Sequence, residues 1–478
     1  MTNEEFRNFG HNMVDWMADY FQQIESLPVK AQVEPGEIYQ QLPELPPEEA
    51  ESFSQIFRDF QTKILKGITH WQHPNFFAYF PANNSYPSIL GEMLTATLGA
   101  QCMIWETSPA AAELEQKVME WMKQMMGLPA EFTGVIQDTA STATLCALLT
   151  ARESATDFQS NKSGLDSKTK FTVYCSTQTH SSIDKAIKIA GIGSDQLRKI
   201  PVDRDFAMRP DALEKEIQTD IALGFHPLCV VASIGTTSST AIDPVKKIGE
   251  ICQKHRLWLH VDGAYAGTAM LLPEKRWIIE GLELADSYVF NPHKWMFTNF
   301  DCSAYYVKDE SKLIRTFEIL PEYLKTQVDK QVNNYRDWGI QLGRRFRALK
   351  LWFVIRSFGV KGLQKKIRHH IELSHYFLEA IQKHPEVELL APTPLNLVCF
   401  RLKPSQLSSE EALTRLNATL MQKMNASGKV YLTHTKLNGI YTLRVAIGQT
   451  HVQKENVDQL LNLLWKTYEE IKSSLKLG

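Results

Sequence analysis

Between residues 86 and 360 the chain alternates short apolar or β-branched runs with longer amphipathic stretches, and this alternation restricts its possible folds more than any other feature. The runs are Phe171 to Ser176, Leu228 to Ile234, Trp258 to Val261, Ser287 to Phe290 and Ser303 to Val307. Short, nearly continuous apolar strands between helices are typical of a mostly parallel sheet with helices on both faces. The sequence therefore predicts an α/β fold with a mostly parallel central sheet.

The first residues predict a helical arm. Phe6, Phe9, Met13 and Tyr20 recur at helical spacing, and a proline-rich stretch follows. The apolar face of this helix has no partner nearby in the sequence, so we expect it to pack on a distant part of the chain or on a second subunit, and a dimer is the simpler case. At 478 residues the chain is too long for one core. The predicted parts are a helical arm at 1–85, a large domain at 86–362 and a small C-terminal α/β domain at 363–478.

Composition narrows the class of function. The 52 basic and 54 acidic residues give a net charge of -2, which offers no electrostatic footprint for nucleic acid or an anionic membrane. The seven cysteines are scattered without a CxxC pair, which favours reduced thiols in a cytoplasmic protein. The N-terminus has no signal-peptide pattern, and no apolar run reaches membrane-spanning length. These features favour a cytoplasmic protein that acts on small molecules.

Polar residues follow the ends of successive predicted strands. His180 comes after the first run, Thr236 and Thr237 after the second, Asp262 after the third, and Asn291 to Lys294 after the fourth. Ligands of open α/β sheets bind at the carboxyl ends of the strands. We therefore expect one site to collect these side chains.

Lys294 is the predicted nucleophile. It lies in Asn291-Pro292-His293-Lys294-Trp295, directly after a predicted buried strand. Partial burial beside an aromatic ring lowers the pKa of an amine and frees it to form a Schiff base. The alternative from this motif alone is a lysine that snorkels from a strand end.

Asp262 closes an apolar strand and is followed by small residues. A buried carboxylate needs a positive charge beside it, and a protonated pyridine nitrogen would supply one. The alternative is an aspartate that caps the next helix.

A phosphate site is predicted before the helix that begins near residue 140. Ala140 and Ser141 could offer backbone amides and a hydroxyl, although an ordinary N-cap cluster explains the same residues. His180 could lie flat on a pyridine ring or act as an acid, or it could be a structural histidine. The four motifs are specific only as a set.

With these motifs in this order, the sequence resembles the group II pyridoxal-phosphate decarboxylases, and among them the aromatic-L-amino-acid decarboxylases. The resemblance implies pyridoxal 5'-phosphate as cofactor, the aminotransferase-like fold (fold type I), and a homodimer that exchanges its arms and shares its active sites. It implies a Schiff base on Lys294, the pyridine partner Asp262 and the stacking residue His180. The other implied cofactor contacts are Ala140, Ser141, Thr237, Asn291 and His293.

The resemblance also implies a substrate pocket and a reaction. Decarboxylation of an aromatic L-amino acid would give an amine and CO2, with Tyr323 as the proton donor. Gly343 matches a position where glycine accompanies indole-bearing substrates in related plant enzymes. The residues implied on the substrate side are Trp71, Phe80, Ala82, His180 and Gly343.

Three other reactions stay open at this point. The chain could decarboxylate another amino acid such as histidine, or it could be an aminotransferase that holds the substrate carboxylate with Arg444. It could also be an aldehyde-forming oxidative decarboxylase, although relatives with that activity have phenylalanine where Tyr323 stands. We interpret two basic clusters as solvated surface, not as metal or nucleic-acid sites. They are His369, His370 and His375, and Arg344, Arg345 and Arg347.

Overall fold

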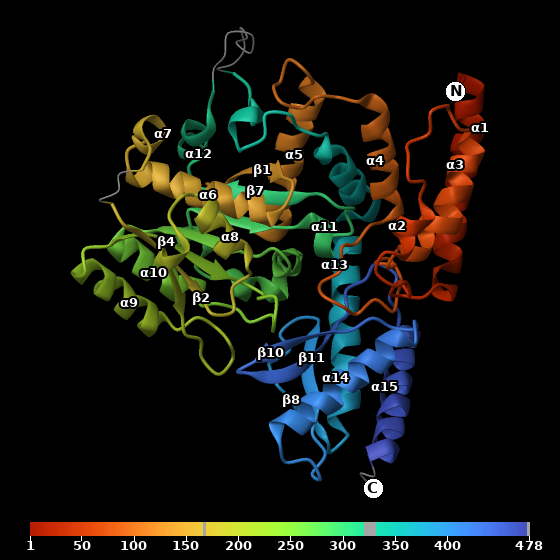
Figure 1. Cartoon of the computed structure of the whole chain (residues 1–478). Helices are drawn as coiled ribbons and strands as arrows, with labels where there is room; N and C mark the ends of the chain where they lie inside the picture. The colour runs from red at the N-terminus through yellow and green to blue at the C-terminus, as the bar shows by residue number, and fades with distance from the viewer. Residues whose placement is uncertain (166–168, 320–330, 476–478) are drawn as a thin grey trace. The chain divides into compact units, whose positions relative to one another are not determined.

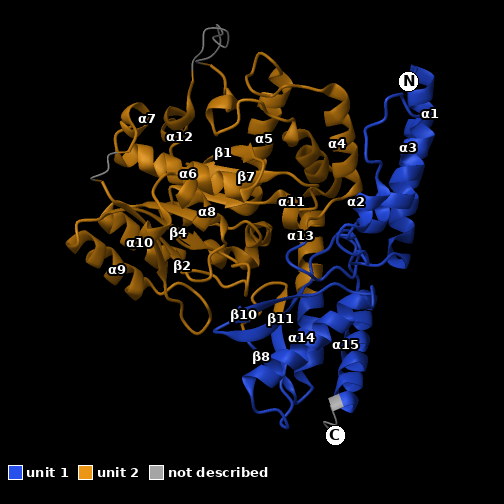
Figure 2. Cartoon of the chain, in the orientation of Figure 1, with its two compact units in different colours: residues 1–81, 373–390, 399–478 blue, residues 82–372, 391–398 orange. Residues whose placement is uncertain are grey.

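The computed structural model describes residues 1–165, 169–319 and 331–475. By the density of its internal contacts the chain divides into two compact units (Figure 2). Unit 1 consists of residues 1–81, 373–390 and 399–478, and unit 2 consists of residues 82–372 and 391–398. The boundaries of the three domains predicted from the sequence stay a prediction, because this division does not test which segments fold independently.

Unit 2 is built on a seven-stranded sheet in the order β1-β7-β6-β5-β4-β2-β3. The five strands β3, β2, β4, β5 and β6 are parallel to one another. Strand β7 runs antiparallel to both β6 and β1. This confirms the mostly parallel α/β sheet. The strands are β1 (Thr133–Gln137), β2 (Phe171–Ser176), β3 (Leu197–Ile200), β4 (His226–Ser233), β5 (Trp258–Asp262), β6 (Ser287–Phe290) and β7 (Ser303–Val307).

Strands β1 and β3 were not predicted, and each lacks a continuous apolar run. In β1, Gly134 interrupts the apolar run. The strand needs a glycine at this position, because a Cβ there would lie 2.4 Å from the Met119 side chain. In β3, Arg198 and Lys199 occupy an edge strand that is partly open to solvent. Their places in the sheet follow from tertiary packing and not from local hydrophobicity.

Helices cover both faces of this sheet (Figure 1). Helix α6 contacts five strands, and α9 and α10 contact each other and β4. The helices of unit 2, with α13 continuing into unit 1, are α4 (Tyr86–Leu98), α5 (Pro109–Met126), α6 (Ala140–Ala155), α7 (Ser160–Ser163), α8 (Ser182–Ile189), α9 (Pro210–Ala222), α10 (Val245–His255), α11 (Pro292–Trp295), α12 (Glu310–Phe317) and α13 (Arg347–Gln382).

Unit 1 contains the predicted N-terminal helix and the small C-terminal sheet, whose order is β10-β11-β9-β8. Its helices are α1 (Asn3–Gln23), α2 (Glu37–Gln41), α3 (Phe53–Asp59), α14 (Glu410–Ala426) and α15 (Lys454–Leu475), and the strands of the small sheet are β8 (Val387–Leu389), β9 (Leu397–Leu402), β10 (Thr433–Leu437) and β11 (Ile440–Ala446). No helix in the described part of the chain is long and apolar enough to cross a membrane.

The expectation that α1 has no partner nearby in the sequence was wrong for part of its apolar face. The Phe9 ring lies 4.6 Å from that of Phe53, and Trp16 meets Phe60 at 5.3 Å between ring centroids. The proline-rich stretch turns the chain back, so an aromatic segment only about forty residues further on covers these rings. Phe6 nevertheless remains 65% exposed.

Candidate active site

The carboxyl ends of β4, β5 and β6 bring the predicted chemical groups together. Ser233 is aligned with Asp262, and Asp262 with Val289, so the loop after β6 emerges beside Asp262. The charges of Asp262 and Lys294 both act on the pKa of His180. The three side chains therefore share one electrostatic environment at one edge of the sheet.

Lys294 lies on α11, the single helical turn that follows β6. Burial lowers the pKa of its ammonium group, and the attraction of Asp262 opposes this shift without cancelling it. Its backbone carbonyl accepts a hydrogen bond of 2.8 Å from Nδ2 of Asn83. Asn83 was not predicted as a site residue, since a contact to a main-chain oxygen leaves no motif in the sequence.

Asp262 is 8% exposed at the end of β5. Its Oδ1 accepts a hydrogen bond of 2.9 Å from the Ala264 amide. No other hydrogen bond to this carboxylate occurs within the described ranges, so Oδ2 can face a cationic partner. A buried carboxylate in this state fits the protonated nitrogen of a pyridine ring.

His180 has open surface, although enough protein surrounds the ring to desolvate it. Burial lowers its pKa, Lys294 acts in the same direction, and Asp262 opposes them. Its Nδ1 accepts a hydrogen bond of 3.1 Å from the Ser182 amide, which places the proton of the neutral ring on Nε2. A neutral ring with one open face can stack on a flat aromatic group.

The start of α6 fits the predicted phosphate site. Thr139 caps the helix, and the first amides, those of Ala140 and Ser141, have no partner within it. Ser141 is exposed, whereas Ala140 before it is buried. Asn291 accepts a hydrogen bond of 2.6 Å from Ser303 at Oδ1, which leaves its amide N–H groups to donate. Thr237 is exposed in the loop after β4. A helix N-terminus with such donors suits a phosphate.

His293 is buried and already held by protein. Its Nδ1 accepts a hydrogen bond of 2.9 Å from the Cys302 amide, and the Phe300 ring lies 4.6 Å away. Burial, with a smaller effect of Lys294, lowers its pKa to about 3. A direct contact of this ring with the cofactor stays a prediction.

The predicted substrate residues belong to different parts of the chain. Trp71 and Phe80 lie in unit 1, and Ala82 and Gly343 lie in unit 2. A Cβ at Gly343 would stand 3.2 Å from Nε2 of Gln101, whose Oε1 accepts a hydrogen bond from the Arg344 amide at 2.7 Å. Tyr323 lies outside the described residues.

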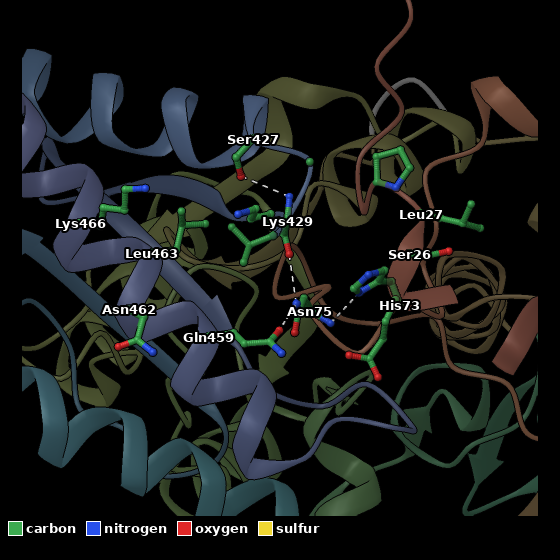
Figure 3. Close-up of a pocket in the computed structure, with 14 residues that line it drawn as sticks. Ser26, Leu27, His73, Asn75, Ser427, Lys429, Gln459, Asn462, Leu463 and Lys466 are labelled. Carbon is green, nitrogen blue, oxygen red and sulfur yellow. Dashed lines mark hydrogen bonds between the residues drawn. The ribbon is translucent and has the colours of Figure 1, made fainter. Parts of the chain in front are cut away.

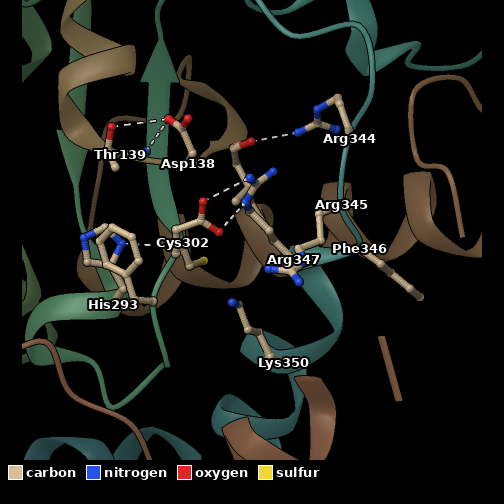
Figure 4. Close-up of polar contacts among 12 residues, drawn as sticks. Asp138, Thr139, His293, Cys302, Arg344, Arg345, Phe346, Arg347 and Lys350 are labelled. Atoms are coloured by element: carbon tan, nitrogen blue, oxygen red, sulfur yellow. Dashed lines mark hydrogen bonds and ion pairs between the residues drawn. The ribbon is translucent and has the colours of Figure 1, made fainter. Parts of the chain in front are cut away.

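The interpretation of the arginine cluster as solvated surface was wrong for two of its members (Figure 4). Arg344 is buried and pairs with Glu115 at 2.7 Å. Arg347 forms two hydrogen bonds with the Asp301 carboxylate, at 3.0 and 3.1 Å. Carboxylates more than forty residues away neutralise these guanidinium groups, and local sequence gives no sign of such partners.

The histidine cluster also differs from the expectation of a solvated face, because His370 is only 2% exposed. Among the residues that the structure describes, no group of three or more His, Cys, Asp or Glu side chains could hold a metal ion.

A pocket in unit 1 is separate from these residues (Figure 3). It encloses about 720 Å³ and is lined by polar residues such as His73, Asn75, Gln459 and Lys466. Its lining residues, all within the described ranges, include none of those predicted to bind cofactor or substrate.

Comparison with known proteins identifies the family to which a chain with this fold and site belongs. Residues 35–403 match the family model described as the pyridoxal-dependent decarboxylase conserved domain, so the chain belongs to this family. The family uses the cofactor that the sequence predicts, pyridoxal phosphate.

Several individual relatives are similar to this chain over nearly its whole length. Tryptophan decarboxylase 2 of Oryza sativa is 44% identical over 97% of this chain and 94% of its own length, and tyrosine decarboxylase 4 of Petroselinum crispum is 43% identical over 99% and 94%. Phenylacetaldehyde synthase of Arabidopsis thaliana is 42% identical over 99% and 97%. The crystal structure of Catharanthus roseus tryptophan decarboxylase with L-tryptophan is similar with a TM-score of 0.93 at 40% identity, covering 98% of this chain and 99% of that one.

Proposed function

We propose that this chain decarboxylates an aromatic L-amino acid to the corresponding amine and CO2. The observation that carries the proposal is the meeting of Lys294, Asp262 and His180 at one edge of the sheet of a pyridoxal-dependent decarboxylase. Relatives named as tryptophan and tyrosine decarboxylases, each matched over nearly the whole chain, support the aromatic substrate class.

Each residue has a proposed task. The amine of Lys294, whose pKa burial lowers, would hold the cofactor covalently. Asp262 would keep the pyridine nitrogen protonated, His180 would stack on the ring, and the start of α6 with Asn291 would bind the phosphate. The bound cofactor supplies a ring that accepts the electron pair left when the carboxylate departs as CO2. Tyr323 would then deliver a proton to the substrate Cα.

The surroundings of Arg444 argue against an aminotransferase. This arginine is 4% exposed, donates a hydrogen bond of 3.0 Å to Thr433, and lies 5.5 Å from the Phe80 ring. Contacts within unit 1 thus occupy the group that would have to bind a substrate carboxylate. A keto acid should therefore not be required for turnover.

A screen of amine and CO2 release tests the substrate class. Purified holoenzyme is incubated with L-tryptophan, L-tyrosine, L-DOPA, L-phenylalanine and L-histidine, with and without a keto acid. We expect release of CO2 and amine from at least one aromatic substrate without keto acid. Turnover of L-histidine alone, or turnover only with keto acid, would contradict the proposal.

Aldehyde formation is the second function to test, because a phenylacetaldehyde synthase is among the relatives. The presence of Tyr323 favours the amine product, since protonation of Cα competes with attack by dioxygen. We predict that the wild type releases amine with little peroxide, and that Tyr323→Phe still releases CO2 but consumes oxygen and forms aldehyde. Amine, peroxide and CO2 are measured together. Amine formation by the variant at the wild-type rate would remove Tyr323 from the reaction.

We also propose a cytoplasmic homodimer with shared active sites. The apolar side of α1 supports the dimer, because Phe6 and Val14 stay 65% and 43% exposed on a helix without buried residues. The cysteines are all buried free thiols, which suits a reducing compartment. Sedimentation of the holoenzyme would test the subunit number.

A further inference from the structure

The segments that carry Asp262 and Lys294 are joined by two stacked aromatic rings. Tyr265 follows Asp262 by three residues, and Trp295 follows Lys294 by one. Their ring centroids are 4.9 Å apart and their planes differ by 8°. Both side chains are at most 1% exposed. The stack is therefore a buried side-chain contact between the two main-chain segments that hold the predicted catalytic groups.

His370 fixes the orientation of the Trp295 ring. Nε1 of the indole donates a hydrogen bond of 2.9 Å to Nδ1 of His370, on α13. Because Nδ1 accepts this bond, the neutral imidazole carries its proton on Nε2. The Phe297 ring lies against the same imidazole at 5.8 Å. The histidine thus contacts two aromatic residues within three positions of Lys294.

The Tyr265 end of the pair is fixed in a similar way. Nδ2 of Asn396 donates a hydrogen bond of 2.5 Å to the tyrosine hydroxyl. Asn396 is 0% exposed, so solvent cannot replace this bond without a local rearrangement. Two buried polar side chains, distant in the sequence from both catalytic segments, therefore hold the stacked rings at their outer edges.

We propose that His370 is a positioning residue for the decarboxylation. Through Trp295 and Tyr265 it sets the placement of the Lys294 amine relative to the Asp262 carboxylate, and it touches neither cofactor nor substrate. The proposal rests on the proposed function for its kinetic consequence. Its structural part is the placement of the Lys294 amine relative to the Asp262 carboxylate. The absorbance of the bound cofactor reports on this placement without any substrate.

Two variants of His370 separate the hydrogen bond from simple packing. In His370→Asn the side-chain oxygen can take the place of Nδ1 as acceptor, whereas His370→Leu fills space and leaves the buried indole N–H without a partner. Leu363→Ala is the matched control, because Leu363 is a fully buried residue of the same helix outside these contacts. It should lower stability without disturbing the rings.

The readouts are the steady-state constants, the pH titration of the visible absorbance of the bound cofactor, and thermal stability. We expect His370→Leu to lower kcat about 10-fold with little change in KM, as a small misplacement of reacting groups does. It should also move the absorbance midpoint by about half a pH unit, because the Lys294 site responds to Asp262. His370→Asn should return both values to within about twofold of wild type.

Three results would overturn the proposal. The first is a His370→Leu enzyme that keeps the wild-type kcat and absorbance midpoint. The second is a His370→Asn enzyme that is as impaired as His370→Leu. The third is a midpoint shift in Leu363→Ala that equals the shift in His370→Leu. If His370→Leu does not fold, Trp295→Phe keeps the stacked ring and removes the N–H donor, and an unchanged midpoint there would also refute it. A wild type that turns over no amino acid would refute the proposed function but not the absorbance result.

Discussion

Two lysines of unit 2, Lys294 and Lys350, lie in contrasting surroundings. The side chain of Lys350, on α13, is 0% exposed and its Nζ lies 2.8 Å from Oε2 of Glu92. Arg347, which pairs with Asp301, lies close to it (Figure 4). For Lys294, by contrast, burial outweighs the attraction of Asp262 and lowers the pKa of the amine. The first lysine forms a direct ion pair with a carboxylate, whereas burial favours the neutral form of the second.

The difference shows how burial alone fails to identify a reactive lysine. A buried charge with a direct counter-charge contributes to structure, and its removal leaves the partner uncompensated. A buried amine whose cost of ionisation is only partly offset becomes a nucleophile. The contrast predicts opposite phenotypes, a loss of chemistry at one position and a loss of stability at the other.

Replacing Lys294 should have the largest effect. Lys294→Ala is expected to lower turnover by about a thousandfold or more, since the covalent attachment of the cofactor is lost. Borohydride reduction followed by peptide mass spectrometry should find the cofactor on Lys294 in the wild type and on no lysine in the variant. Trapping of the cofactor on Lys350 would break the comparison outright.

Removing the charge of Asp262 should come next. Asp262→Asn keeps the size of the side chain and should still bind cofactor, but it should lower kcat by about 10²–10³-fold, as the loss of a preorganised electrostatic partner does. The matched change Glu92→Gln, beside Lys350, should leave kcat within a few-fold. Near-normal turnover in Asp262→Asn would refute its role at the pyridine nitrogen.

Lys350→Met should act on stability. Loss of the ammonium leaves the Glu92 carboxylate with Arg345 and the amide of Asn299, each at 3.3 Å, so we expect a cost of about 3 kcal/mol in the free energy of unfolding. Urea denaturation of the holoenzyme measures this cost. The double change Lys350→Met with Glu92→Leu removes both charges and should recover much of the stability. A stable single variant would mean that this pair resembles a surface ion pair.

His260, a fully buried histidine of β5, should make the smallest contribution, visible as a dependence of stability on pH. Burial lowers the pKa of His260 to about 4, whereas an unfolded histidine titrates near 6.5. Between these values the unfolded chain binds the extra proton, so stability is fully present above about pH 6.5 and falls as pH decreases toward 4, by about 1.4 kcal/mol per pH unit. His260→Gln should show a shallower fall in urea titrations at pH 6.5 and 5. Equal slopes would show that the ring is not neutral in the folded state.

Sequence reasoning succeeded where the information is local. The runs at Phe171 to Ser176, Ser287 to Phe290 and Ser303 to Val307 agree with β2, β6 and β7 at both ends, because burial on both sheet faces requires continuous apolar residues. Asp262 and Lys294 became candidates because the first closes such a run and the second lies four residues after the end of another.

The residues that were missed act across long sequence separations. Asn83 binds a carbonyl oxygen 211 residues away. Arg344 pairs with Glu115 on α5, 229 positions before it, and His370 accepts a hydrogen bond from an indole 75 positions before it. A single sequence shows the type of such residues but not their partners. Aromatic, basic and amide side chains therefore look like surface until the fold is known.

The contact between Gly343 and Gln101 has a consequence for directed evolution of this enzyme. A serine at 343 would bring its Cβ within 3.2 Å of the glutamine amide, and the glutamine could yield only by straining its hydrogen bond with the Arg344 amide. The two positions should therefore show epistasis, with a change at 343 tolerated only after a smaller residue has been accepted at 101. Libraries that vary one position at a time would miss the combinations that this chain can accept.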